Sequence, residues 1–313
     1  GACNVSVGTC AMYTNSTGGC NVAVGALALA SNCGSGYQTA IGFSVLCANV
    51  AGNCNTAVGA LSLACNTDGV NNVALGLTAL QFNRSGCQNV AVGAWALRSN
   101  TSGCDNIGIG FCAAYNNCIG FGITAVGSCA LLCNTSGCYN TAVGQAALYY
   151  NSTGNYNTAV GNNAMYCFFT GTYNTAVGYG AMQGSSTKNN NYGLYNTAVG
   201  SCALLCLSCG CYNTALGMSA GFSITTGSFN TAVGWAAQCC HTTGQNNTSV
   251  GFQAGGYTGG ANNNTSIARC CWHSSMLLNI KELSISCAPM NIITFKMYSV
   301  VIFHYSVIAL ANT

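Results

Sequence analysis

The chain has 313 residues, of which only six are Lys or Arg and three are Asp or Glu, whereas about a quarter of the residues in a soluble domain are normally charged. This composition excludes an ordinary soluble enzyme surface. Half of the residues are hydrophobic, so the chain also lacks the high charge and low hydrophobicity that typify disorder. The net charge of +3 is small and dispersed, and it provides no basic stripe for binding nucleic acid.

A glycine recurs at a fixed interval, at the end of strings such as Asn-Thr-Ala-Val-Gly. The interval is 17 residues throughout, except for one step of 22 residues between Gly178 and Gly200. Arrays of helical hairpins are excluded, because their repeat is about 33 residues or longer. We therefore predict an all-β fold, a parallel β-solenoid (β-roll) of about 15 coils with a 17-residue period. The solenoid should cover residues 1–268, and residues 269–313 should form a non-repeat apolar tail or cap.

Positions −4 to −1, counted from this glycine as position 0, predict a short strand. They are Asn, then Thr or Val, then Ala or Ser, then Val, Ile or Leu. Alternate side chains of a strand face opposite ways, and the residue at −1 is always aliphatic, so we expect −1 to point into the coil. The alanines at −2 would then point outward as an interface row, which includes Ala142, Ala159 and Ala176. A tight bend inside the coil is the alternative explanation of their small size.

The turns and the asparagines complete the predicted coil. Glycine adopts positive φ without steric cost, so the glycines at 0 and +10 predict corners. The asparagines at −4 should stack about 4.8 Å apart and form a ladder of amide hydrogen bonds, which Gln38 extends and Ile123 breaks. The extra residues near 185–193 should bulge from one coil without disturbing its neighbours.

The run from Ala215 to Gly234, ALGMSAGFSITTGSFNTAVG, resembles the repeats of phage tail-fibre and adhesin-like proteins. Those repeats are akin to the left-handed parallel β-roll heads of trimeric autotransporter adhesins (YadA-like). The resemblance extends from Cys3 to about Ala268 and implies the same kind of solenoid. It also implies a homotrimer, and either a spacer or a binding head, because such repeats serve as both.

Cysteine occurs 24 times, far more often than in cytosolic proteins, which favours an oxidising compartment. Four pairs are candidate disulfides, because they flank a turn or occupy equivalent positions in adjacent coils. These pairs are Cys133 with Cys138, Cys206 with Cys211, Cys87 with Cys104, and Cys3 with Cys20. Stacked apolar thiols are one alternative. A metal site at Cys202, Cys206, Cys209 and Cys211 is the other, but it lacks the paired spacing and the His ligands expected of zinc.

Ten asparagines begin an Asn-x-Ser/Thr acceptor for N-glycosylation. Five recur at the turn position +7, where we expect the most accessible side chains. These candidate sites are Asn15, Asn83, Asn100, Asn134 and Asn151. In a repeat so rich in Asn and Thr, acceptors also arise by chance.

The repeat is lost after Trp272, and the segment from Met297 to Ala311 is apolar apart from a few residues such as His304. A membrane-spanning helix needs about 20 apolar residues, so a cap on the last coil is favoured over a membrane anchor. A disordered tail is the other alternative. Gly1 already lies within a repeat, which suggests a fragment or a processed product.

Catalysis needs titratable groups that are held together, and the few in this chain do not recur in register. They are Asp68, Asp105, Glu282, His241, His273 and His304. We therefore predict no enzyme, no cofactor and no metal. The predicted function is that of a structural extracellular fibre or fibre shaft, for attachment or coating at the surface of a cell or a virion.

The predicted partner is another copy of the chain, in a head-to-tail polymer or a homotrimer, with surface glycans as a further candidate. The alternative function is a ligand-binding solenoid, either a carbohydrate-binding adhesin or, with less support, an ice-binding protein. An ice-binding face would use the −3 row from Thr124 to Thr265. A paired Thr-x-Thr pattern is absent, and apolar residues interrupt the row in the first half of the chain. The interrupting residues are Val5, Val22, Val73, Val90 and Ile107.

Overall fold

The computed structural model describes residues 1–184, 191–256 and 260–267. This part of the chain contains sixteen strands of three residues each, and no helix in it is long and apolar enough to cross a membrane. The strands are β1 (Val5–Val7), β2 (Val22–Val24), β3 (Thr39–Ile41), β4 (Thr56–Val58), β5 (Val73–Leu75), β6 (Val90–Val92), β7 (Ile107–Ile109), β8 (Thr124–Val126), β9 (Thr141–Val143), β10 (Thr158–Val160), β11 (Thr175–Val177), β12 (Thr197–Val199), β13 (Thr214–Leu216), β14 (Thr231–Val233), β15 (Thr248–Val250) and β16 (Thr265–Ile267).

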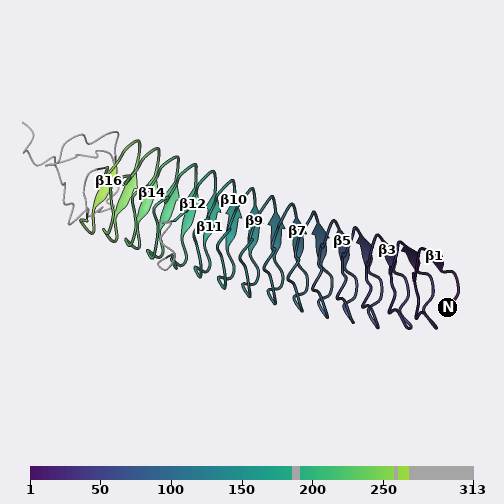
Figure 1. Ribbon diagram of the computed structural model, residues 1–313. Helices are drawn as coiled ribbons and strands as arrows, with labels where there is room; N and C mark the ends of the chain where they lie inside the picture. Colours follow the sequence, from purple (N-terminus) through teal and green to yellow (C-terminus); the bar gives the residue numbers. More distant parts are fainter. Residues whose placement is uncertain (185–190, 257–259, 268–313) are drawn as a thin grey trace, which may run out of the picture. The chain divides into compact units, whose positions relative to one another are not determined.

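The sixteen strands form a single parallel sheet in chain order, so each strand pairs with those of the preceding and following coils (Figure 1). Residues one repeat apart lie opposite each other, as Ala142, Ala159 and Ala176 do. Each coil contributes one strand to this sheet and returns through turns. The predicted all-β parallel solenoid with a 17-residue period is confirmed.

The register survives the longer step between β11 and β12. Thr175 pairs with Thr197, and Ala176 pairs with Ala198, as in every other coil. The insertion therefore leaves the neighbouring strands undisturbed, as predicted, although residues 185–190 themselves lie outside the described residues.

The described solenoid belongs to the first of two compact units, Gly1–Asn279, and the second unit is Ile280–Thr313. The predicted tail or cap, residues 269–313, lies outside the described residues. The predicted boundary between residues 268 and 269 therefore stays a prediction.

The interior of the coil is filled by the alanines at −2 and +3 and by Leu or Met at +4. The predicted outward interface row is wrong, because Ala142, Ala159 and Ala176 are 0% exposed. The side chains at −3 and −1 face outward instead, and in β9, β10 and β11 they are partly or fully exposed while the residue between them is buried.

The narrow cross-section of the coil explains why −2 is small. In one coil Gly108 replaces this alanine, and an added Cβ there would lie 3.0 Å from Leu97 Cγ and 3.3 Å from the Ala113 carbonyl oxygen. Leucine at +4 thus fills the interior up to the strand, and a larger side chain at −2 has no room. The row therefore lies inside the coil, as in the alternative left open by the sequence, but lack of space rather than a tight bend accounts for its small size.

The corners follow the prediction in part. The glycines at 0 have φ between 120° and 138°, a conformation that favours glycine. The glycines at +10 do not have positive φ. At Gly137 an added Cβ would lie 2.4 Å from the Gly154 carbonyl oxygen, so these glycines are required by close packing between coils. Most of the other left-handed residues are not glycines. They lie at −5, +2 and +4, for example Tyr156, Asn163 and Met165 with φ of 55°, 56° and 51°.

The asparagines at −4 form the predicted ladder inside the coil. Asn89 Nδ2 donates to Asn72 Oδ1 at 3.0 Å and to the Gly103 carbonyl oxygen at 2.9 Å. The Asn89 backbone N–H donates to the same Asn72 Oδ1 at 3.0 Å. These side chains thus pair backbone groups that are buried between neighbouring coils, which would otherwise destabilise the fold.

Gln38 and Ile123 act on this ladder as predicted. The Gln38 N–H donates to Asn21 Oδ1 at 2.9 Å, and Gln38 Oε1 accepts from the Asn55 N–H at 3.1 Å. At Ile123 the ladder is interrupted, because the apolar side chain offers no acceptor to the Asn140 N–H, which has no partner in the described part of the chain. The ladder resumes where the Asn157 N–H donates to Asn140 Oδ1 at 2.9 Å.

A second amide ladder runs through the coil at +7. Asn100 Nδ2 donates to Asn83 Oδ1 at 2.8 Å and to the Gly103 carbonyl oxygen at 2.9 Å. This ladder extends from Asn15 to Asn151, and the buried Phe168 occupies the next +7 position. Asn151 Oδ1, at the end of the second row, has no partner within the described residues. The two rows of amides otherwise pair from coil to coil and hold successive coils in one register.

Candidate functional site

The +7 row is not accessible for glycosylation. Asn83, Asn100, Asn134 and Asn151 are 0% exposed, because their amides belong to the second interior ladder. Of the five candidates only Asn15, in the first coil, is partly exposed. The expectation that +7 is the most accessible set of acceptors is therefore wrong.

Two of the predicted cysteine pairs, Cys87 with Cys104 and Cys3 with Cys20, occupy equivalent positions in adjacent coils, and the other two pairs flank a turn. Cys87 and Cys104 are in contact, since the Cys87 N–H donates to Cys104 Sγ at 3.1 Å. Burial raises the pKa of the Cys104 thiol, which lowers its thiolate fraction and slows its oxidation. The candidate cysteines Cys3, Cys20, Cys87, Cys104, Cys138, Cys206 and Cys211 carry free thiols in this structure. Disulfide pairing therefore stays a prediction.

The described residues contain no group of three or more His, Cys, Asp or Glu that could hold a metal ion. His241 lies at +7, in the interior position that Asn occupies in earlier coils, and neither of its ring nitrogens has a hydrogen-bond partner among the described residues. Burial lowers the pKa of His241, so this imidazole is held neutral inside the solenoid. His241 therefore packs in the interior of the coil and is not placed to act as a ligand or a base.

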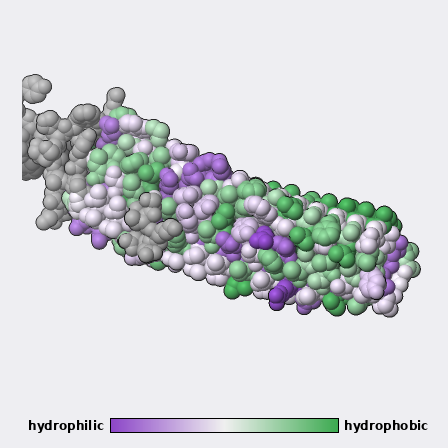
Figure 2. Space-filling view, in the orientation of Figure 1, coloured by the Kyte–Doolittle hydropathy of each residue, from purple (hydrophilic) through white to green (hydrophobic). Residues whose placement is uncertain are grey.

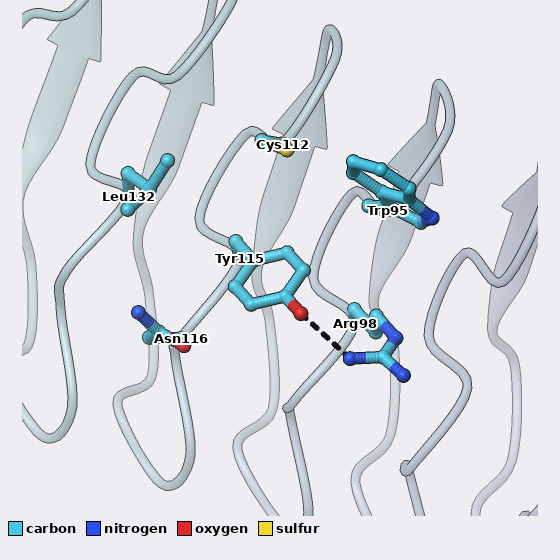
Figure 3. Close-up of a pocket in the computed structure, with 6 residues that line it drawn as sticks. All are labelled: Trp95, Arg98, Cys112, Tyr115, Asn116 and Leu132. Atoms are coloured by element: carbon cyan, nitrogen blue, oxygen red, sulfur yellow. Dashed lines mark hydrogen bonds between the residues drawn. The ribbon is translucent and has the colours of Figure 1, made fainter.

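A shallow hollow of about 420 Å³ opens on the outer surface of the coils that follow β6, β7 and β8 (Figure 3). Its wall comes from positions +2, +5 and +6 of three successive coils, and it combines aromatic, polar and aliphatic side chains with one cation. The lining residues are Trp95, Arg98, Cys112, Tyr115, Asn116 and Leu132.

The guanidinium of Arg98 is held in place from several sides. Its Nε donates to Gln81 Oε1 at 2.9 Å, and one Nη donates to the Tyr115 hydroxyl at 2.6 Å. It also lies over the Phe82 ring, 4.9 Å from the centroid, and 5.6 Å from the centroid of the Tyr115 ring. These contacts fix the orientation of a side chain that is otherwise flexible.

Arg98 has no carboxylate partner within the described residues, whose acidic side chains are Asp68 and Asp105. Two of its five N–H groups are used in the hydrogen bonds above, which leaves three for a ligand. Trp95 borders the same hollow, is 38% exposed, and packs against Phe111 at a centroid distance of 5.1 Å. The chemistry of the hollow suits an anion that carries an apolar face.

Comparison of the chain with known protein families, curated proteins and solved structures gave no match. The parallel solenoid is therefore established by the geometry alone.

An exposed column of stacked aromatic rings runs along position −5. Neighbouring rings lie 4.9 to 5.0 Å apart, with interplanar angles of 1° to 15°. The column consists of Tyr139, Tyr156, Tyr173, Tyr195, Tyr212 and Phe229. Because the ring faces inside the column are covered by the neighbouring rings, a sugar ring cannot stack along the length of the column. The column therefore stabilises the contact between coils.

Sequence reasoning missed both the hollow and the aromatic column. Gln81, Arg98 and Tyr115 are one repeat apart, so an alignment of the coils places them in one column and predicts their contact. The tyrosines before Asn-Thr-Ala-Val-Gly were visible in the same way. What the sequence does not show is which turn positions face outward, because that depends on the left-handed residues at +2 and +4.

Proposed function

We propose that this solenoid is the shaft of an extracellular fibre of the tail-fibre or adhesin type, at the surface of a cell or a virion. The observation that carries the proposal is the unbroken register of all sixteen strands. Catalytic and binding residues are often presented by irregular loops, whereas a shaft needs similar units that stack in one register.

The interior supports the same function. Most coils are tied to the next through backbone pairing, through the −4 ladder and, up to Asn151, through the +7 ladder. Each unit contacts only its neighbours, so the number of coils sets the length of the rod and little else. This modularity allows the length of a spacer to change by the addition or loss of whole coils.

Removal of two whole coils tests the shaft. Deletion of residues 141–174 removes 34 residues and joins Asn140 to Thr175 in register, so the protein should stay folded and shorten by roughly 10 Å, at about 4.8 Å per coil. Small-angle X-ray scattering and circular dichroism measure both effects.

Deletion of residues 141–170 is the matched control, because 30 residues are not a whole number of repeats. Four residues are then left over and have to bulge from one coil, as the extra residues between β11 and β12 do without a shift of register. This variant should keep its β signal but melt at a lower temperature than the in-register deletion. If the in-register deletion unfolds the protein, the coils are not interchangeable units and the shaft is contradicted. Self-association, as a head-to-tail polymer or a homotrimer, is part of the proposal, and sedimentation of the intact protein at several concentrations tests it.

Binding of an acidic carbohydrate is a second candidate function, and the hollow at Arg98 favours it. A carboxylate can accept from the free N–H groups of Arg98, while the C–H face of the sugar lies against Trp95. A binding head and a spacer are compatible within one fibre.

Titration with a glucuronate oligosaccharide, followed through Trp fluorescence, tests this candidate. We expect Arg98→Gln to weaken binding roughly 10- to 100-fold, since a hydrogen bond to a charged group is worth about 1.5–3 kcal/mol. Arg84→Gln, which removes the other described arginine, should leave binding unchanged. Equal binding of a neutral glucose oligosaccharide would contradict the candidate.

A further inference from the structure

The outward face of the sheet changes character along the chain. Over β1–β7 position −3 is mostly Val or Ile, and apolar residues gather over these coils (Figure 2). Over β8–β16 position −3 is always Thr, and each of these threonines pairs with the threonine of the next strand. We call these nine residues the outward Thr row: Thr124, Thr141, Thr158, Thr175, Thr197, Thr214, Thr231, Thr248 and Thr265.

The hydroxyls of the outward Thr row have no protein partner in the described part of the chain. Threonines in the turns behave differently. Thr101 Oγ1, Thr135 Oγ1 and Thr225 Oγ1 each donate to a backbone carbonyl of the next coil at 3.0 Å. The fold thus uses its turn hydroxyls internally and leaves one hydroxyl per strand, with a donor and two acceptor sites, facing water.

The outward Thr row is also regular and stiff. Parallel pairing without a register shift sets the same spacing of about 4.8 Å between successive hydroxyls. Threonine is β-branched, so its χ1 is restricted, and the buried alanine beside it anchors each strand in the core. The row at −1, which shares this face, is Val, Leu or Ile throughout. Neither row contains a charge or an aromatic ring.

We propose that this face binds the surface of an ice crystal. A ligand that uses all nine positions has to repeat hydrogen-bonding groups at one fixed spacing over the length of nine coils, and crystalline water does so. The Thr hydroxyls would take up lattice positions of water, while the Thr methyl groups and the −1 side chains lie against water molecules that keep their hydrogen bonds to one another. This inference goes beyond a shaft and does not rest on it.

Two features of the face favour ice over other periodic ligands. Docking of a polysaccharide relies on aromatic platforms, and the outward Thr row has none. Docking of a second copy would bury hydroxyls that need partners, whereas the more apolar face over β1–β7 would serve that purpose better. Because the row is rigid before binding, little conformational entropy is lost when ice is bound, so many weak contacts can sum to stable adsorption.

Freezing-point hysteresis and partitioning into a growing ice front measure this activity directly on the whole protein. Wild type should show both. Thr175→Leu combined with Thr197→Leu should abolish most of the hysteresis, because the larger side chains interrupt the flat row at its centre. Tyr156→Leu, in the exposed aromatic column at −5 and not in the outward Thr row, is the matched control and should leave the hysteresis unchanged.

A gain-of-function variant keeps the test independent of any loss of folding. Val73→Thr, Val90→Thr and Ile107→Thr would join the row to Thr39 and Thr56, and they should raise the hysteresis. Wild type that neither shifts the freezing point nor enters ice overturns the proposal. So does co-sedimentation with crystalline cellulose in the absence of any ice effect, and so does an effect of Thr175→Leu and Thr197→Leu on oligomeric state alone.

Discussion

Replacing Ala159 with Arg should unfold the solenoid around β10 and abolish much of its β signal in circular dichroism. Ala159 is 0% exposed and lies between Ala142 and Ala176 in the interior row. An arginine there has neither space nor a counter-charge, and burial of an unpaired charge costs at least several kcal/mol. This is comparable with the whole stability of a domain, about 5–15 kcal/mol.

Val160→Arg is the matched control, because Val160 is adjacent in the same strand but faces outward and is partly exposed. We expect this variant to fold, with a change in stability within about 0.5 kcal/mol, as for most surface substitutions. Thermal denaturation followed at the β band compares the two. The opposite result, a folded Ala159→Arg and an unfolded Val160→Arg, would contradict the interior position of the alanine row.

The period of the repeat was sufficient to predict the fold, but not which side of the strand faces inward. A three-residue strand has two possible orientations, and the aliphatic residue at −1 suggested the wrong one. The deciding quantity is the width of the coil, which Leu97 and its equivalents at +4 fill up to position −2. The residues at +4 reach this position through a left-handed backbone conformation, as at Met165. Glycine is the usual sequence marker of that conformation, and it is absent at most of these positions.

The +7 asparagines show the same limit for the candidate sites. Asn before Ser or Thr suits an exposed turn as well as an interior ladder, since its amide pairs with backbone in both. Recurrence in every coil from Asn15 to Asn151 was the signal that favoured the ladder. Arg98 was missed for the opposite reason, because an isolated cation has no recurrence at all.

Asn157→Leu should destabilise the solenoid by about 2–6 kcal/mol, since each unpaired buried polar group costs about 1–3 kcal/mol. Asn157 Nδ2 donates to the Gly171 carbonyl oxygen at 2.7 Å, and its Oδ1 accepts from the Asn174 N–H at 3.0 Å. A leucine of similar size fills the space but pairs with neither group. Amide hydrogen exchange at Asn174 measures the local loss, which matters because a repeat protein need not unfold in one step.

Ile123→Asn provides the reverse test at the point where the ladder is broken. The new Oδ1 would accept from the Asn140 N–H, which has no partner in the described part of the chain, so exchange at Asn140 should slow and stability should rise by about 1 kcal/mol. In the unmodified protein, Asn140 should accordingly exchange faster than Asn157 or Asn174. If the three amides are equally protected, or if Ile123→Asn destabilises the protein, the −4 ladder contributes shape but not stability. The coils would then be held together by backbone pairing and by the Ala and Leu core alone.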